Sequence, residues 1–278
     1  MVTTPPALLI AGHGTRDEGG ADAFRAFVGE LGRRHPEIPV AGGFIGQSSP
    51  PLGDALADLV ERGVREFAAV PMTLAPAGRA KGDIPAALAR EQQRHAGVSY
   101  TCGRPLGPHP KLLAVLERRL DEALGGGRRS PSDRARTTVL LVGGGSTDPE
   151  ANAEVCRAAR LLWEGRGYAS VETAFVSPAA PDVPSGLDRC LRLGARRVVV
   201  LPYFLFNGVL PNRVRQQTAG WADAHPEVEV FSAEVMGATE ELAELVMERY
   251  REVVASDDGQ GQGQGHIQRH HSDHAPAR

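Results

Sequence analysis

Cysteine is scarce in this sequence, and the cysteines present are not grouped. The 278 residues include three of them, Cys102, Cys156 and Cys190, which lie far apart and form no Cys-x-x-Cys pair. Neither a disulfide framework nor a cysteine-rich metal site is therefore indicated. A reducing cytoplasm fits this usage best.

Strong charge and long apolar segments are lacking as well. The formal net charge is −3, with 23% charged and 41% hydrophobic residues, so bulk charge gives no sign of a nucleic-acid or membrane partner. The first residues have no basic region, their apolar run is too short for a signal peptide, and no later stretch approaches the length of a membrane span. We expect a soluble protein of one large or two ordinary domains.

The chain does contain an internal duplication of roughly 120 residues. Gly12 matches Gly143 and Asp17 matches Asp148, a shift of 131 residues in both cases. In each copy, apolar runs typical of buried parallel strands alternate with helical patterns. This pattern predicts an α/β protein with two tandem similar domains, each a parallel sheet with helices on both faces. The predicted divisions are a first repeat over 1–125, a linker over 126–136, a second repeat over 137–255 and a disordered tail over 256–278.

In the first repeat, strands are expected near 7–11, 40–45, 64–72 and 98–102. A helix over 84–94 should hold Pro85 in its first turn, where proline is tolerated. A helix over 112–124 should close the first repeat. Residues 125–132, rich in glycine, serine and charge, should then form the linker.

The histidine between two glycines at residues 12–14 is the first candidate functional residue. It follows the first predicted strand and precedes a helical pattern. In open α/β sheets, ligands bind where strands end, and glycines let a substrate approach the backbone closely. Because His13 is matched by Gly144, the site is predicted in the first repeat. An ordinary strand-to-helix turn with an incidental histidine is the alternative.

The matching loop of the second repeat, residues 143–150, predicts the start of a helix. Asp148 should be its cap and Pro149 its first residue. The backbone amides could bind an anion, but the loop lacks the lysine and the spacing of a nucleotide P-loop.

The last residues have the composition of a tail. Residues 257–265 are low in complexity and are expected to be disordered. They lead into four of the nine histidines, His266, His270, His271 and His274. This composition is typical of a metal-collecting segment, and a functionless solvated extension is the alternative.

Three motifs in order resemble one family. They are LLIAGHGTRD at 8–17, the stretch 70–85 with VPMTL and GRAKGDIP, and RPLGPHP at 104–110. The chain resembles the CbiX/SirB-type sirohydrochlorin chelatases, in their long two-domain form, from about residue 7 to 254. The resemblance implies an ATP-independent lyase that inserts Fe²⁺ for sirohaem, or Co²⁺ for cobalamin, into sirohydrochlorin, with no organic cofactor.

His13 matches the histidine of that family's Gly-His-Gly motif. Metal insertion requires two pyrrole N–H protons to leave and a hydrated metal ion to lose water. A neutral imidazole can both accept a proton and bind a metal near pH 7. We therefore expect His13 to be the catalytic residue, as proton acceptor and metal ligand.

The resemblance also implies two further metal-site residues, and this chain has neither. The family's glutamate after the second strand is replaced by Gly46, and its second histidine is replaced by Arg79. Arginine is permanently protonated and cannot bind a cation, and a single ligand holds a labile metal poorly. Gln47 could supply a weak oxygen, but it should point to the other face of the strand. The changes Gly46→Glu and Arg79→His are accordingly expected to raise activity.

Basic residues near the predicted strand ends are candidates for binding the carboxylates of sirohydrochlorin. A guanidinium can hold a carboxylate through two hydrogen bonds. The candidates should share one rim if the sheet is parallel, and a scattered solvated surface is the alternative. They are Arg16, Arg79, Lys81 and Arg104, with Lys111 beside them.

Three functions remain open at this point. The first is a chelatase, and the second is a non-catalytic homologue that holds the tetrapyrrole or delivers metal. The third, a histidine phosphatase, would need an arginine before His13, where the chain has Gly12. The sequence does not choose among Fe²⁺, Co²⁺ and Ni²⁺ and leaves the oligomeric state open. By analogy, the two domains should face one another across a cleft.

Overall fold

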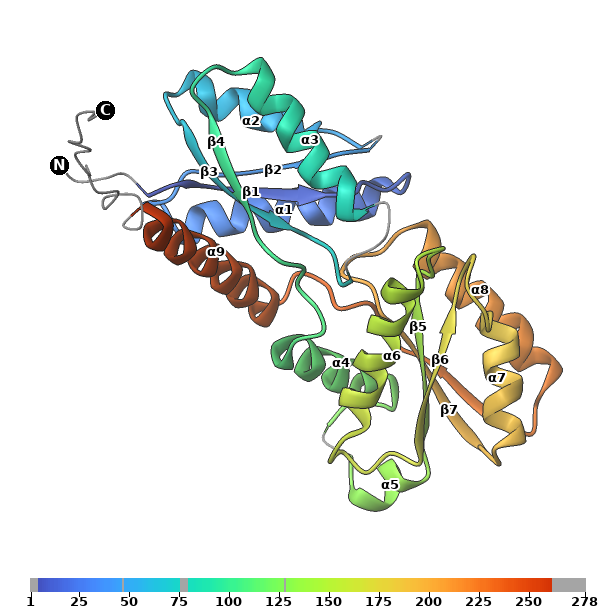
Figure 1. Ribbon diagram of the computed structural model, residues 1–278. Coiled ribbons are helices and arrows are strands. Elements are labelled where there is room, and N and C mark those ends of the chain that lie inside the picture. The colour runs from blue at the N-terminus through green and yellow to red at the C-terminus, as the bar shows by residue number, and fades with distance from the viewer. Residues whose placement is uncertain (1–4, 47, 76–79, 128, 262–278) are drawn as a thin grey trace, which may run out of the picture.

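The computed structural model describes residues 5–46, 48–75, 80–127 and 129–261. Two α/β domains lie side by side in this part of the chain, each built around a four-stranded parallel sheet (Figure 1). The predicted fold class is therefore confirmed. Within the described residues, no helix combines the length and the apolar character needed to cross a bilayer.

The first repeat folds into alternating strands and helices. Its elements are β1 (Ala7–Gly12), α1 (Glu18–Arg34), β2 (Val40–Phe44), α2 (Leu52–Glu61), β3 (Glu66–Pro71), α3 (Ala80–Arg94), β4 (Ser99–Cys102) and α4 (Pro110–Ala123). The strand order is β2-β1-β3-β4. The four expected strands are present, but α3 begins at Ala80, so Pro85 lies beyond its first turn.

The second repeat has the same plan, preceded by one short helix. Its elements are α5 (Pro131–Ala135), β5 (Thr138–Gly143), α6 (Pro149–Trp163), β6 (Ser170–Phe175), α7 (Val183–Arg192), β7 (Arg197–Pro202), α8 (Val209–Ala224), β8 (Glu229–Ser232) and α9 (Glu240–Gly261). The strand order β6-β5-β7-β8 repeats that of the first sheet. The bounds of β1 and β5, and those of β3 and β7, differ by 131 residues, as the duplication predicts.

The central strands and the helix starts follow directly from the sequence. The apolar residues of β1 are fully buried, as expected for a strand covered on both faces. Asp17 caps α1 by accepting a hydrogen bond from the Gly20 N–H at 2.8 Å. Asp148 caps α6 in the same way at 3.1 Å to the Glu150 N–H, with Pro149 as the first helical residue. The predicted helix start in the second repeat is thus confirmed.

The last helix of each repeat packs against the sheet of the other repeat. Helix α9 lies against β3 and β4 of the first sheet, while α4 lies against β7 and α6 of the second (Figure 1). Both helices bury apolar side chains in one continuous core that includes inner faces of both sheets. We call α4 and α9 the exchanged helices. The helix expected near 112–124 does end the first repeat, as α4, but its apolar face covers the second sheet and not the first.

Ion pairs join the exchanged helices to each other. Arg118 of α4 donates to Glu241 of α9 at 2.6 and 3.1 Å, and Lys111 pairs with Glu244 at 2.7 Å. Arg249 is only 2% exposed and donates to the Pro105 carbonyl at 3.2 Å. The hydrogen bond from Arg118 holds the pKa of Glu241 at about 2.

The predicted divisions of the chain follow the sequence repeats. They do not follow the packing, in which each sheet is covered in part by a helix of the other repeat. The linker over 126–136 contains α5, and its Arg134 is 8% exposed and donates to Glu117 at 2.6 Å. The predicted tail starts at 256, but α9 continues to Gly261. Residues 262–278, with the four tail histidines, lie outside the described residues.

Candidate functional site

A cavity of about 370 Å³ lies between the two domains. Its walls are residues 12–15 after β1 and 72–75 after β3, opposite residues 143–146 after β5 and 203–207 after β7. With the strand order 2-1-3-4, the connections after the two central strands diverge, which is where open α/β sheets bind ligands. Both domains therefore direct their natural binding edge into one shared cavity.

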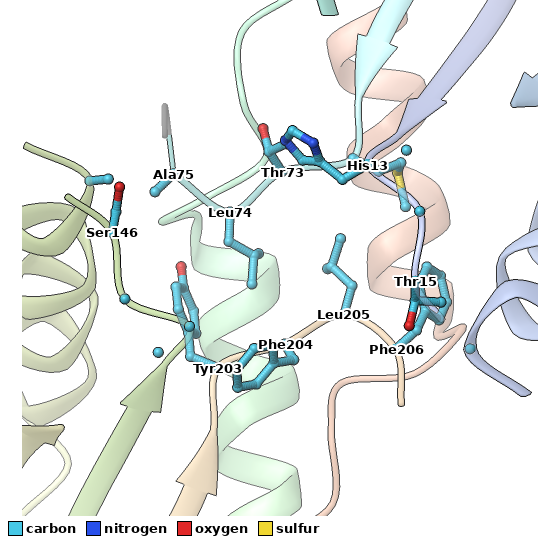
Figure 2. Close-up of a pocket in the computed structure, with 18 of the residues that line it drawn as sticks. His13, Thr15, Thr73, Leu74, Ala75, Ser146, Tyr203, Phe204, Leu205 and Phe206 are labelled. Atoms are coloured by element: carbon cyan, nitrogen blue, oxygen red, sulfur yellow. The ribbon is translucent and has the colours of Figure 1, made fainter. Parts of the chain in front are cut away.

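The lining is largely apolar and comes from both domains. Figure 2 shows His13, Thr73, Leu74 and Ala75 on one side, and aromatic side chains of residues 203–206 on the other. Phe206 also reaches across to the first domain, where its ring lies 6.4 Å from that of Phe24. A lining of this kind suits an apolar part of a ligand, held by a few polar contacts.

His13 is at the position that the sequence predicts. It directly follows β1, its side chain is exposed, and it lines the cavity. The neighbouring backbone is fixed on both sides of the strand end. The Met72 N–H donates to the Ala11 carbonyl at 2.8 Å, and the Ile45 N–H donates to the Gly12 carbonyl at 2.9 Å. An imidazole on a fixed loop at a binding edge can act as a proton acceptor or as a metal ligand.

Gly144 faces the same cavity from the second domain. A Cβ at this residue would lie 3.7 Å from atoms of Leu210 and Phe204, which is an ordinary contact. The fold itself thus has room for a side chain at 144. Because residue 144 is glycine, that volume stays part of the cavity. Gly144 is the repeat equivalent of His13, so one wall has an imidazole where the other has open space.

Gly46 has a steric role that the sequence did not reveal. A Cβ at this residue would lie 2.4 Å from the carbonyl oxygen of His13, which is backbone and cannot move aside cheaply. The glycine therefore permits the chain after β2 to pass directly against the histidine loop. This observation argues against a simple gain from Gly46→Glu, because no side chain fits there unless the chain after β2 or the His13 loop moves.

Tyr203 is a polar residue of the cavity that the sequence analysis missed. It is 3% exposed, and its hydroxyl has no hydrogen-bond partner among the described residues. Burial raises the pKa of this phenol, so it remains a neutral donor. The repeat shift pairs it with Met72, which also lines the cavity, and that correspondence was the available signal.

The predicted basic residues are not all brought together. Arg16 is exposed and follows Thr15 of the cavity wall. Arg104 is not among the residues that line the cavity. It donates to both carboxylate oxygens of Glu252 in α9, at 3.0 and 2.7 Å. Lys81 lies at the start of α3, its side chain is outside the described part of the structure, and Arg79 is outside it altogether.

Metal donors are few in this site. Among the residues that the structure describes, no three His, Cys, Asp or Glu side chains come together as a metal site. His109 caps α4 and contacts Glu248 at 3.2 Å. Within the described cavity lining, His13 is the side chain suited to bind a metal ion.

The fold and the cavity define a class, that of two-domain α/β proteins with a ligand site between matching sheets. Residues 7–123 and 138–253 match the CbiX family. The chain is 35% identical over 249 residues to a sirohydrochlorin cobaltochelatase of Priestia megaterium, covering 88% of this chain and 79% of the relative. It is 29% identical over 257 residues to a sirohydrochlorin ferrochelatase of the same organism, covering 91% and 92%.

Solved structures agree with the sequence relatives. SirB from Bacillus subtilis with Fe³⁺ superposes with a TM-score of 0.76 at 26% identity, over 92% of this chain and 98% of that one. A cobalt complex of the sirohydrochlorin chelatase SirB from Bacillus subtilis subspecies spizizenii gives 0.73 at 25% identity, over the same shares. This chain belongs to the CbiX family, in its long two-domain form.

Proposed function

We propose that this protein is a sirohydrochlorin chelatase that inserts a divalent metal ion into sirohydrochlorin, with His13 as the catalytic residue. The observation that carries the proposal is the position of His13. It is an exposed imidazole at a strand end, in an apolar cavity shared by two domains. The relatives named as sirohydrochlorin chelatases support the same reaction.

The proposed chemistry balances with the groups of this chain. Sirohydrochlorin loses two pyrrole N–H protons and gains one M²⁺, which is a substrate. His13 accepts a pyrrole proton and passes it to water, then repeats this for the second proton. Its other role, in the neutral form and before it accepts a proton, is to hold the incoming ion while water leaves, because both roles use the same ring nitrogen lone pair. No ATP or organic cofactor takes part.

The second domain contributes the opposite wall. The Gly144 wall and the aromatic side chains after β7 exclude water from one face of the macrocycle. The Tyr203 hydroxyl offers one buried donor. Arg16, Arg79 and Lys81 are proposed to bind substrate carboxylates at the rim, while Arg104 would first have to leave Glu252.

The decisive experiment mixes the purified protein with sirohydrochlorin and Fe²⁺, Co²⁺ or Ni²⁺, and follows the absorbance change of metallation against a protein-free control. We expect a clear acceleration with at least one metal, and loss of about 10²-fold or more in His13→Ala, the size typical of a removed general base. A rate equal to the control for all three metals would refute the proposal.

A non-catalytic tetrapyrrole-binding protein is the second candidate. The observation that favours it is the small number of metal donors around His13 among the described residues. The same assay separates the two functions. A binding protein would change the absorbance of bound sirohydrochlorin without accelerating metal insertion.

A further inference from the structure

The loop that carries His13 is intrinsically flexible, and the structure shows what fixes it. His13 lies between Gly12 and Gly14, and Gly14 has φ +92°, a conformation that favours glycine. A chain with glycine on both sides of a functional residue has many accessible conformations. Precise placement of the imidazole therefore requires anchors on both sides of this short stretch.

One anchor is the backbone pairing at Gly12, described above, and the other is a side chain. The Ser48 hydroxyl accepts a hydrogen bond from the Thr15 N–H at 2.8 Å and donates one to the Thr15 carbonyl at 2.6 Å. We call these two bonds the Ser48 clamp. Ser48 is 8% exposed, so both bonds are shielded from water. A hydroxyl has one donor and two acceptor sites, and the clamp uses both functions.

The second repeat fixes the equivalent peptide with a different residue. Ser146, which corresponds to Thr15, donates from its N–H to the Asn152 side-chain oxygen at 2.9 Å. Its carbonyl accepts from the Asn152 amide nitrogen at 2.8 Å. At the shift of 131, Ser48 corresponds to Ala179 and Asn152 corresponds to Ala21.

Each repeat thus has one side chain that binds this backbone. At the position where the other repeat has its binding side chain, it has alanine. The same backbone N–H and C=O are bound in both loops by side chains from different elements: Ser48 precedes α2, and Asn152 lies in α6. Thr15 and Ser146 occupy equivalent positions, and each has its backbone N–H and C=O bound by a different side chain. This indicates that the backbone at this position must be held in place.

We propose that Ser48 is a positioning residue for His13, acting through Thr15 and not on the substrate. The inference rests on the proposed function, because it assigns a purpose to the fixed loop. The role differs from that of a metal ligand, since the Ser48 hydroxyl donates to and accepts from the backbone of Thr15.

The test compares Ser48→Ala, Ser48→Thr and Asn152→Ala. Ser48→Ala is expected to speed hydrogen exchange at the Thr15 amide about tenfold, the effect of one lost hydrogen bond. It should lower kcat for metal insertion by about 10- to 100-fold, the range expected for a catalytic group displaced by up to about 1 Å. KM should change by less than about threefold, because Ser48 does not contact the substrate in this proposal. Ser48→Thr keeps the hydroxyl and should restore both readings.

Asn152→Ala is the matched variant. It removes the same pair of bonds from a loop that bears no histidine, so its effect should fall on KM and on exchange at Ser146. Equal losses of kcat in Ser48→Ala and Asn152→Ala would show a general loosening of the cavity and would overturn the positioning role. Unchanged kcat in Ser48→Ala, with faster Thr15 exchange, would overturn it too.

Failure of the proposed function remains distinguishable. If the wild-type protein inserts no metal, the nitrogen-15 resonances of the His13 ring still report on its position. A single sharp set in the wild type and in Ser48→Thr, broadened in Ser48→Ala, supports the clamp. Identical spectra in all three proteins refute it.

Discussion

The close contact at Gly46 makes a prediction opposite to the one drawn from the family pattern. Replacing this glycine by glutamate would restore the carboxylate that the resemblance implies. The Cβ would however lie 2.4 Å from the His13 carbonyl oxygen, about 1 Å short of the 3.4 Å at which ordinary contact begins. Either the chain after β2 or the histidine loop must move by about that amount.

The displacement has two measurable costs. Overpacking of this kind destabilises by about 1–3 kcal/mol, which for a chain of this size lowers Tm by about 2–12 °C, at 2–4 °C per kcal/mol. A misplacement of about 1 Å at a catalytic group lowers the rate by up to about 100-fold. We therefore expect Gly46→Glu to melt earlier and to insert metal more slowly than the wild type.

Thermal melting and the metallation assay are run on the same preparations. Gly46→Ala separates the steric effect from the carboxylate and should show the same loss of stability. Gly144→Ala is the matched stability control, because its Cβ makes only ordinary contacts at 3.7 Å. If Gly46→Glu has the same Tm as the wild type and inserts metal faster, the loop can move at little cost and our reasoning is wrong.

Three further predictions concern the cavity wall, the exchanged helices and the tail. Gly144→Val should raise KM for sirohydrochlorin about tenfold with little change in Tm, and an unchanged KM would show that the substrate does not use this wall. Glu241 has a pKa lowered to about 2 from an ordinary 4.5 by its hydrogen bond from Arg118, so its contribution to stability is present above about pH 4.5 and is lost as the pH falls toward 2. Glu241→Gln should flatten the fall of unfolding free energy over that window in urea titrations, and an unchanged slope would contradict the assignment. Deleting 262–278 should reduce the metal bound per chain in equilibrium dialysis, and equal stoichiometry would rule out a metal-collecting tail.

The sequence was sufficient for the strands, the repeat and the place of His13 directly after β1. A buried parallel strand is a short apolar run, and the shift of 131 residues locates each element twice, so errors in one copy are corrected by the other. The same comparison set His13 against Gly144 and thereby located the asymmetric pair of walls. The helix caps were equally readable, because Asp148 and Pro149 act locally.

The exchange of helices was not readable, for a physical reason. The apolar stripe of an amphipathic helix shows that one face is buried but not which sheet covers it. Helices α4 and α9 would satisfy their own repeats just as well by pattern. Charge complementarity between Arg118 and Glu241 is visible only once the helices are known to be neighbours.

The finer parts of the site depend on close approaches between distant segments. From the sequence, Gly46 was interpreted as a missing metal ligand. The structure shows that the backbone of His13 occupies the space that a side chain at residue 46 would need. The Ser48 hydroxyl follows no periodic pattern, because its partner Thr15 lies 33 residues away. The Tyr203 hydroxyl packs close to Gly107, on the other repeat. Such contacts are determined by how loops are arranged in space, and a single sequence does not record that arrangement.

The exchanged helices make the two halves of this chain equivalent to the subunits of a domain-swapped dimer. Each half alone would leave part of one sheet face uncovered, beside α1 in the first repeat and α6 in the second. A cut in the connection between α4 and α5 should leave a two-piece protein that stays assembled and cofolds from its pieces. Because the two halves are joined in one chain, their sequences need not be identical. A true dimer must carry the same residue at both strand ends, whereas a fused pair can keep an imidazole on one wall and an open space on the other.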